Sequence, residues 1–226
     1  MYFCNPKMKS STFAVLFDMD GVLIDSNPFH KTALQQFCRK HGYDLTEEEL
    51  RSRIYGRTNK DWITNLFGDI PQSLLHQYAD EKEALFREIY QNDIKPLNGL
   101  NSFLDLLKTN SVPVAIATSA PRANVDFTLH HTGIGKYFET ILDESFVSRG
   151  KPDPEIYLKT AAALGFPAEK CIVMEDSLSG IASGQAAGSK VVALATTHSP
   201  EELTHASMVI RDFSNLSLQH LQQLMD

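Results

Sequence analysis

Two carboxylates stand close together where a short apolar run ends. Asp18 directly follows residues 13–17, which are all apolar, and Asp20 and Gly21 come just after it. In an extended chain, side chains two positions apart point to the same side, and two converging carboxylates repel each other unless a cation or a proton lies between them. Oxygen ligands of this kind suit Mg²⁺. The alternative is a loop whose aspartates only cap backbone groups, but the longer motif Asp-Met-Asp-Gly-Val-Leu-Ile-Asp-Ser favours a functional site.

Polar side chains also follow two other apolar runs. Thr118 and Ser119 follow one of them, where a hydroxyl and backbone N–H groups can donate to a phosphoryl oxygen. The alternative for this pair is an ordinary turn. Glu175 and Asp176 end another run and would complete an oxygen shell for Mg²⁺. The alternative for this acidic pair is an aspartate that caps the following helix.

Lys151 follows a glycine and precedes two prolines in the segment Gly-Lys-Pro-Asp-Pro-Glu, residues 150–155. The ammonium of Lys151 would neutralise a phosphoryl group and keep Asp18 ionised. The alternative is a solvated surface lysine before a helix. We place this segment and the three acidic or hydroxyl motifs at the carboxyl ends of buried strands, which meet at one edge of a parallel sheet.

Apolar runs alternate with helical patterns over most of the chain. One helical stripe is formed by Leu100, Phe103, Leu104 and Leu107, and a second lies within residues 157–164. This alternation predicts an α/β fold with a parallel sheet and helices on both faces. The expected strands lie within residues 13–17, 112–118, 171–175, 191–195 and 208–210.

A stretch of helical patterns without strands interrupts this alternation. We expect a core domain from residues 1–26 and 95–226, and a helical cap domain from residues 27–94, which is a candidate lid. Thr46 precedes three glutamates and is a candidate helix N-cap. The charged run 80–83 is expected on a polar helix face. Residues 1–11 are expected to lie outside the fold as a tail.

Composition narrows the class of protein further. The 226 residues carry a net charge of −7, which argues against nonspecific nucleic-acid binding. Cys4, Cys38 and Cys171 lack the spacing of a metal site or a disulfide framework. No apolar run is long enough for a bilayer, and no signal peptide is recognisable. We therefore expect a cytoplasmic monomer whose partner is a phosphorylated small molecule, with no nucleic acid and no membrane.

The order of these motifs resembles the haloacid dehalogenase superfamily of phosphatases and phosphomutases. More narrowly, the chain resembles the β-phosphoglucomutase and sugar-phosphatase branch, from Phe13 to the last helix. The resemblance implies a Rossmann-like, doubly wound parallel sheet with an inserted helical cap.

The resemblance also implies a mechanism. It makes Asp18 the nucleophile that becomes an aspartyl phosphate. It makes Asp20 the general acid and base, with its backbone carbonyl on Mg²⁺. Thr118 and Lys151 are then the residues that bind the transferring phosphoryl group. The implied ligands of the Mg²⁺ cofactor are Asp18, Asp20, Glu175 and Asp176.

The cap residues are expected to select the substrate. The branch has a histidine at the position of His30 and a lysine at the position of Lys82, although the simpler expectation for this lysine is a solvated helix face. Ser119 and Arg122 follow the second motif and are further candidates for substrate binding. Residues 56–59 match a cap loop that faces the active site, which adds the candidates Gly56, Arg57 and Thr58.

The cap loop departs from the pattern at one position. β-Phosphoglucomutases carry an arginine for a distal phosphate where this chain has Asn59, and Arg57 is the candidate replacement. The first hypothesis is therefore a Mg²⁺-dependent phosphatase of a small metabolite, such as a sugar phosphate. The alternatives are β-phosphoglucomutase, a pyrophosphatase, a dehalogenase and a noncatalytic module on the same fold. The last of these is disfavoured because every core motif is intact.

Overall fold

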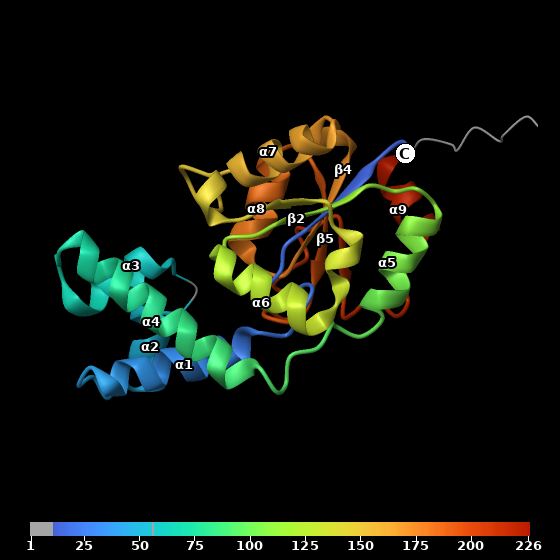
Figure 1. Cartoon of the computed structure of the whole chain (residues 1–226). Helices are drawn as coiled ribbons and strands as arrows, with labels where there is room; N and C mark the ends of the chain where they lie inside the picture. The colour runs from blue at the N-terminus through green and yellow to red at the C-terminus, as the bar shows by residue number, and fades with distance from the viewer. Residues whose placement is uncertain (1–10, 56) are drawn as a thin grey trace, which may run out of the picture. The chain divides into compact units, whose positions relative to one another are not determined.

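The computed structural model describes residues 11–55 and 57–226 (Figure 1). The chain divides into two compact units. The sheet unit comprises Met1–Asp25, described from residue 11 onward, together with Lys95–Asp226. The helical insert is Ser26–Ile94, and it interrupts the sheet unit in sequence. Whether the insert is a substrate-specificity domain stays a prediction.

The sheet unit is built on six parallel strands in the order β3-β2-β1-β4-β5-β6. In the register of the central strand, Val15 pairs with Val114 on one side and with Ile172 on the other. The predicted parallel α/β sheet is therefore confirmed, with one strand added. The strands are β1 Ala14–Phe17, β2 Val114–Ala117, β3 Thr140–Leu142, β4 Cys171–Glu175, β5 Lys190–Leu194 and β6 Met208–Ile210.

The two faces of the sheet carry separate cores because successive side chains of a strand point to opposite faces. Phe17 packs in one core with residues of α5, α6 and α9, whereas Leu16 packs in the other with residues of α7 and α8. Figure 1 shows these two groups of helices on either side of the strands. The doubly wound arrangement is thus confirmed. The helices of this unit are α5 Leu100–Thr109, α6 Arg122–Thr132, α7 Glu155–Leu164, α8 Leu178–Ala186 and α9 Leu218–Met225, with short 3₁₀ turns η1 Ile134–Tyr137, η2 Glu144–Phe146 and η3 Ala168–Lys170.

The helical insert has its own apolar core. Leu34, Phe37 and Trp62 are buried in it together with residues of the neighbouring helices. The predicted cap at Thr46 is confirmed: its hydroxyl accepts from the backbone N–H of Glu49, whose side chain in turn accepts from the backbone of Thr46. The helices are α1 Asn27–Lys40, α2 Glu47–Arg53, α3 Asn59–Phe67 and α4 Gln72–Tyr90.

The charged run 80–83 differs from its prediction. We expected a solvated polar face, but Lys82 and Glu83 are only 5% and 7% exposed. They pair with each other at 2.8 Å, and this pairing makes their burial tolerable. Among the described residues, no helix combines the length and the hydropathy that a bilayer crossing requires.

Candidate active site

Asp18 is the first residue after β1, and the sheet holds it in place. Its backbone N–H donates to the carbonyl of Met174 at 3.0 Å, which extends the pairing of β1 with β4 by one residue. The carboxylate is buried, and its Oδ1 accepts from the Nζ of Lys151 at 2.6 Å. Burial raises the pKa of Asp18 well above its usual value, and Lys151 opposes that rise.

Lys151 connects the acids of the site. Its Nζ also donates to Oε1 of Glu175 at 2.6 Å and to the carbonyl of Ala117 at 3.2 Å. Burial alone would lower the pKa of Lys151, but the carboxylates of Asp18 and Glu175 raise it well above its usual value. The alternative of a solvated surface lysine is therefore wrong.

One expectation about Lys151 is wrong as well. We placed it at the carboxyl end of a buried strand, but β3 ends at Leu142, and η2 and an exposed stretch follow before Lys151. No apolar run precedes this lysine, so no strand can end there. A long loop brings its ammonium to Asp18 instead.

Glu175, the last residue of β4, has both carboxylate oxygens engaged. Oε1 accepts from Lys151 and from the hydroxyl of Tyr157 at 2.8 Å. Oε2 accepts from the backbone N–H groups of Asp176 and Ser177 at 2.9 and 3.0 Å, and from the Ser177 hydroxyl at 3.0 Å. Burial would raise the pKa of Glu175, but Lys151 and these donors lower it. This carboxylate is therefore charged and tightly held.

Asp176 follows directly and is also buried. Its Oδ2 accepts from the hydroxyl of Thr197. Burial and the neighbouring Glu175 raise the pKa of Asp176 to about 7. The alternative of an aspartate cap on α8 is wrong for Asp176, because Ser177 caps that helix by accepting from the N–H of Gly180 at 3.0 Å.

Three carboxylates of this site lie close enough to bind one cation. Oxygens of Asp18, Glu175 and Asp176 all lie within 4.8 Å of one another. Burial is the main cause of the raised pKa values of Asp18 and Asp176, and repulsion from the neighbouring carboxylates adds to it. A bound cation would relieve this repulsion. The donors are hard oxygens, so the group fits Mg²⁺. Asp20 is not in this group. It is partly buried in the turn after β1, and its predicted role as acid, base and ligand stays a prediction.

Thr118 directly follows β2, which pairs with β1 in parallel, so it lies at the same edge of the sheet as Asp18. Thr118 is buried, its N–H donates to Leu142 at 3.0 Å, and its Oγ1 accepts from the N–H of Ala120 at 3.1 Å. Ser119 is exposed. Arg122 is exposed too, and its guanidinium pairs with Asp126 at 2.8 Å. Neither Ser119 nor Arg122 has a described contact with Asp18, Glu175 or Asp176.

The candidates in the helical insert form their own contacts. Lys82 donates to His30 at 3.0 Å and is buried, so the expectation of a solvated lysine is wrong. Arg57 donates to the backbone carbonyl of Ser52 at 2.8 Å. Thr58 caps α3. Gly56 lies outside the described residues. The predicted roles of these residues in substrate binding stay predictions.

Sequence reasoning missed two residues that contact the acidic cluster, Thr197 and Tyr157, and a third, Thr196, that binds the turn after β1. Thr197 binds Asp176, and the preceding Thr196 donates to the carbonyl of Gly21 at 2.6 Å. Both threonines follow the β5 run, and polar residues after a buried strand were the signal used for the other motifs. Tyr157, in contrast, looks like any other core position of α7, and only the fold brings its hydroxyl to Glu175.

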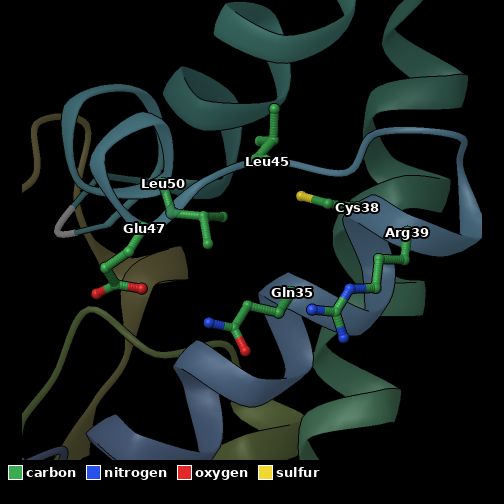
Figure 2. A pocket seen from close by; sticks show the side chains of 6 residues that line it. All are labelled: Gln35, Cys38, Arg39, Leu45, Glu47 and Leu50. Atoms are coloured by element: carbon green, nitrogen blue, oxygen red, sulfur yellow. The ribbon is translucent and has the colours of Figure 1, made fainter.

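A separate surface pocket of about 180 Å³ lies within the helical insert, between α1 and α2 (Figure 2). It contains none of the predicted site residues. The lining residues are Gln35, Cys38, Arg39, Leu45, Glu47 and Leu50. The thiol of Cys38 is unreactive at neutral pH because burial raises its pKa to about 11.

Comparisons with known proteins agree with the fold. The model of the haloacid dehalogenase-like hydrolase family matches residues 15–194. A hydrolase of family IA, variant 3, from Entamoeba histolytica has a solved structure with 32% identity and a TM-score of 0.88, covering 94% of this chain and 99% of the other. A solved β-phosphoglucomutase from Clostridium difficile has 26% identity and a TM-score of 0.80, covering 94% and 96%.

Curated relatives point to the same class. A phosphorylated carbohydrates phosphatase of Thermotoga maritima is 33% identical over 77% of this chain and 81% of its own length. Two proteins of Arabidopsis thaliana, a chloroplastic 5-amino-6-(5-phospho-D-ribitylamino)uracil phosphatase and a bifunctional riboflavin kinase/FMN phosphatase, are 28% and 32% identical over 97% and 94% of this chain. The chain spans only 60% and 56% of the lengths of these two proteins.

The chain belongs to the haloacid dehalogenase-like hydrolase family. Within this family it is related to the β-phosphoglucomutases, as the resemblance implied, and three of the relatives named above are phosphatases or contain one.

Proposed function

We propose that this protein hydrolyses the phosphate ester of a small carbohydrate-like metabolite, with Asp18 as the covalent nucleophile. The observation that carries the proposal is the buried pairing of Asp18 with Lys151 at 2.6 Å, beside two further carboxylates. A buried carboxylate held in this way is ready to attack a phosphorus atom, and the ammonium next to it balances phosphoryl charge.

The first half of the reaction forms a bond to Asp18. An oxygen of its carboxylate attacks phosphorus, the ester P–O bond breaks, and the leaving alkoxide takes a proton from Asp20. Lys151 and Thr118 hold the phosphoryl oxygens while the charge is redistributed. Asp18 and Asp176 would hold Mg²⁺, which would neutralise phosphoryl charge when it is bound.

The second half releases the phosphate. Water attacks the aspartyl phosphate, the bond between phosphorus and the Asp18 oxygen breaks, and the proton of the water passes to Asp20. Inorganic phosphate leaves, and both aspartates return to their starting states. Glu175 contributes by fixing Lys151, since its own oxygens are fully engaged.

The helical insert supports a monophosphate substrate and is our proposed substrate-specificity domain. At the position where a mutase would carry an arginine, the amide of Asn59 donates to Glu83 at 3.0 Å and accepts from the indole of Trp62 at 2.9 Å. Arg57, the candidate replacement, is bonded to the carbonyl of Ser52. A second phosphate group therefore has no obvious cationic partner among these residues. A carbohydrate substrate is proposed by analogy with the Thermotoga maritima relative.

The deciding experiment measures phosphate release from a panel of sugar and polyol phosphates with Mg²⁺. A coupled assay for the conversion of β-glucose 1-phosphate to glucose 6-phosphate runs beside it. We expect rapid phosphate release from at least one member of the panel and none from the Asp18→Asn variant. Efficient isomerisation that depends on a bisphosphate primer, with little free phosphate, would overturn the proposal and establish the mutase.

A further inference from the structure

The loop that carries Lys151 leads directly into α7, and the first turn of this helix carries Tyr157. Tyr157 is fully buried, and α7 packs against β1, β2 and β3 of the sheet. The hydroxyl of Tyr157 donates to Oε1 of Glu175 at 2.8 Å. The segment that supplies the ammonium of the site therefore also supplies a side chain that fixes one of its partners.

The ammonium of Lys151 has an acceptor for each of its three N–H bonds. Nζ donates to Oδ1 of Asp18 and to Oε1 of Glu175, both at 2.6 Å, and to the carbonyl of Ala117 at 3.2 Å. The Lys151 side chain is 7% exposed, and Nζ lies 4.9 Å from the ring centroid of Tyr157, within the range of a cation–π contact. Tyr157 thus acts on the ammonium directly through its ring and indirectly through its hydroxyl.

Lys151 and Tyr157 donate to the same oxygen, Oε1 of Glu175. A carboxylate can only accept, so the tyrosine hydroxyl is the donor. Because the ammonium lies 2.6 Å from both Asp18 and Glu175, its position depends on a balance between two negative charges. In the proposed reaction the carboxylate of Asp18 loses its charge when it bonds to phosphorus. The ammonium must then stay with the phosphoryl oxygens instead of moving toward Glu175, and a hydroxyl that shares Oε1 and holds it in place opposes that movement.

We infer that Tyr157 is a positioning residue of the proposed reaction, whose hydroxyl and ring hold the Lys151 ammonium between Glu175 and the phosphoryl group on Asp18. The catalytic part of this inference rests on the proposed function. The positioning part concerns only contacts within the sheet unit, so it can be measured without a substrate.

The first test observes the ammonium itself by ¹H–¹⁵N NMR on the whole chain at low temperature, with the Lys151 signal assigned from a Lys151→Arg variant. The protons of a solvated ammonium exchange rapidly with water, whereas those of a fully hydrogen-bonded, buried ammonium exchange slowly. Tyr157→Phe removes the hydroxyl and keeps the ring, so we expect it to shift the Lys151 signal and to speed its exchange with water. Tyr157→Leu removes the ring as well and should increase both effects.

Tyr137 provides a matched control because it makes the same kinds of contact with other partners. Its hydroxyl donates to Oδ1 of Asp105 at 2.7 Å, and Nζ of Lys136 lies 5.0 Å from its ring centroid. Tyr137→Phe should leave the Lys151 signal unchanged, and backbone amide spectra show whether the sheet of each variant is folded. A folded Tyr157→Phe variant with the native Lys151 signal and exchange rate would overturn the inference. So would a native chain in which the Lys151 ammonium exchanges rapidly.

The second test is kinetic and uses the rate constant of a single turnover, which does not depend on the fraction of the protein that is folded. We expect Tyr157→Phe to lower this rate constant by about tenfold, since a displacement of 1 Å costs up to roughly 10²-fold. The loss should be equal for sugar and aryl phosphates, because Lys151 acts on the phosphoryl group and not on the leaving group. Tyr137→Phe should retain the native rate constant. A folded Tyr157→Phe variant with the native rate constant would overturn the catalytic role.

The two tests separate failure of the inference from failure of the proposed function. If the native chain releases no phosphate from any member of the panel, the proposed function fails, and the Lys151 signals still decide whether Tyr157 positions the ammonium. If the native chain releases phosphate and Tyr157→Phe changes neither the signal nor the rate constant, the inference fails and the proposed function stands.

Discussion

Asp18 makes the sharpest prediction at the scale of single residues. Asp18→Asn keeps the shape of the side chain but removes the nucleophilic carboxylate, so we expect turnover to fall to background with the fold intact. Phosphate release and circular dichroism check the two parts of this prediction. A variant with near-native turnover and unchanged Mg²⁺ dependence would rule out the covalent mechanism.

Replacing Asp20 should lower turnover almost as much as replacing Asp18. Asp20→Ala removes the proposed proton donor to the leaving group, and general acid–base catalysis contributes about 10²–10⁴-fold, so we expect a loss of turnover in that range. The assay compares kcat for a sugar phosphate with that for an aryl phosphate, whose better leaving group needs less protonation. The loss should be smaller for the aryl phosphate. An equal loss below about tenfold for both would contradict the role.

Glu83 should make the stability of the helical insert depend on pH. Burial would raise the pKa of Glu83, but Lys82 lowers it from 4.5 to about 2. A lowered pKa stabilises the folded state above the usual pKa, and this stabilisation is lost as the pH falls from about 4.5 to about 2. The shift corresponds to about 3 kcal/mol.

Denaturant titrations at several pH values test this pH-dependent contribution of Glu83 to stability. Glu83→Gln should lower the free energy of unfolding at neutral pH, and the gap to the native chain should narrow as the pH falls below about 4.5. Glu88→Gln, an exposed change on the same helix, serves as the control and should leave the free energy of unfolding nearly unchanged at every pH. A gap that is independent of pH would show that the pairing with Lys82 is not its source.

Sequence reasoning recovered residues whose position relative to a strand identified them. Asp18, Thr118 and Asp176 follow buried apolar runs, and the fold places them as expected. Lys82 and Tyr157 could not be recognised in the same way. The contact of Lys82 with His30 depends on the packing of α4 against α1, and the contact of Tyr157 with Glu175 depends on the packing of α7 against the sheet. Neither packing leaves a local pattern in the sequence.

At the scale of elements, the first turn of α8 depends on a glycine. A Cβ at Gly180 would lie 1.8 Å from Oε1 of Glu175, so only glycine lets this carboxylate lie against the helix. Alanine is a better helix former than glycine, so Gly180→Ala would otherwise stabilise α8. We expect instead a loss of about 1–3 kcal/mol from overpacking.

Turnover of the Gly180→Ala variant should fall as well, because a displaced Glu175 no longer holds Lys151 in place. Urea denaturation and phosphate release measure the two effects. Gly135→Ala is the matched control, since its Cβ would meet only the side chain of Leu129 at an ordinary 3.6 Å. A Gly180→Ala variant as active and stable as the control would contradict the proposed positioning of Lys151 by Glu175.

The continuous apolar runs were predicted as strands, and so was the weaker run that forms β6, but β3 was not predicted. The apolar runs that became β1, β2, β4 and β5 are continuous because both faces of these strands are buried. β3 has three residues, of which only Leu142 is buried, so it lacks such a run. The error about Lys151 has the same origin, because the loop after β3 carries no periodic signal.

At the scale of the whole molecule, Mg²⁺ should stabilise the folded chain. A ligand at 100 times its Kd raises the free energy of unfolding by about 2.7 kcal/mol, which for a chain of this size raises Tm by about 5–10 °C. Thermal unfolding with and without EDTA measures this. Because the pKa of Asp176 is about 7 without the cation, binding displaces a proton below that pH, and the gain should shrink as the pH falls.

Asp176→Asn provides the specificity test for this effect. It should abolish most of the Mg²⁺-dependent rise in Tm, whereas Asp126→Asn, an exposed aspartate paired with Arg122, should keep it. A rise that survives in Asp176→Asn would place the cation somewhere other than the three carboxylates.

The strand order also determines when the protein can fold as it is made. β1 is central in the sheet, yet both of its neighbours, β2 and β4, are translated after the entire helical insert. A nascent chain on the ribosome therefore carries an apolar strand without partners, while the insert, continuous in sequence, has all its own contacts available early. The strand that bears the nucleophile must wait for Cys171–Glu175 to emerge, so chaperones have the longest access to the segment on which the proposed chemistry depends.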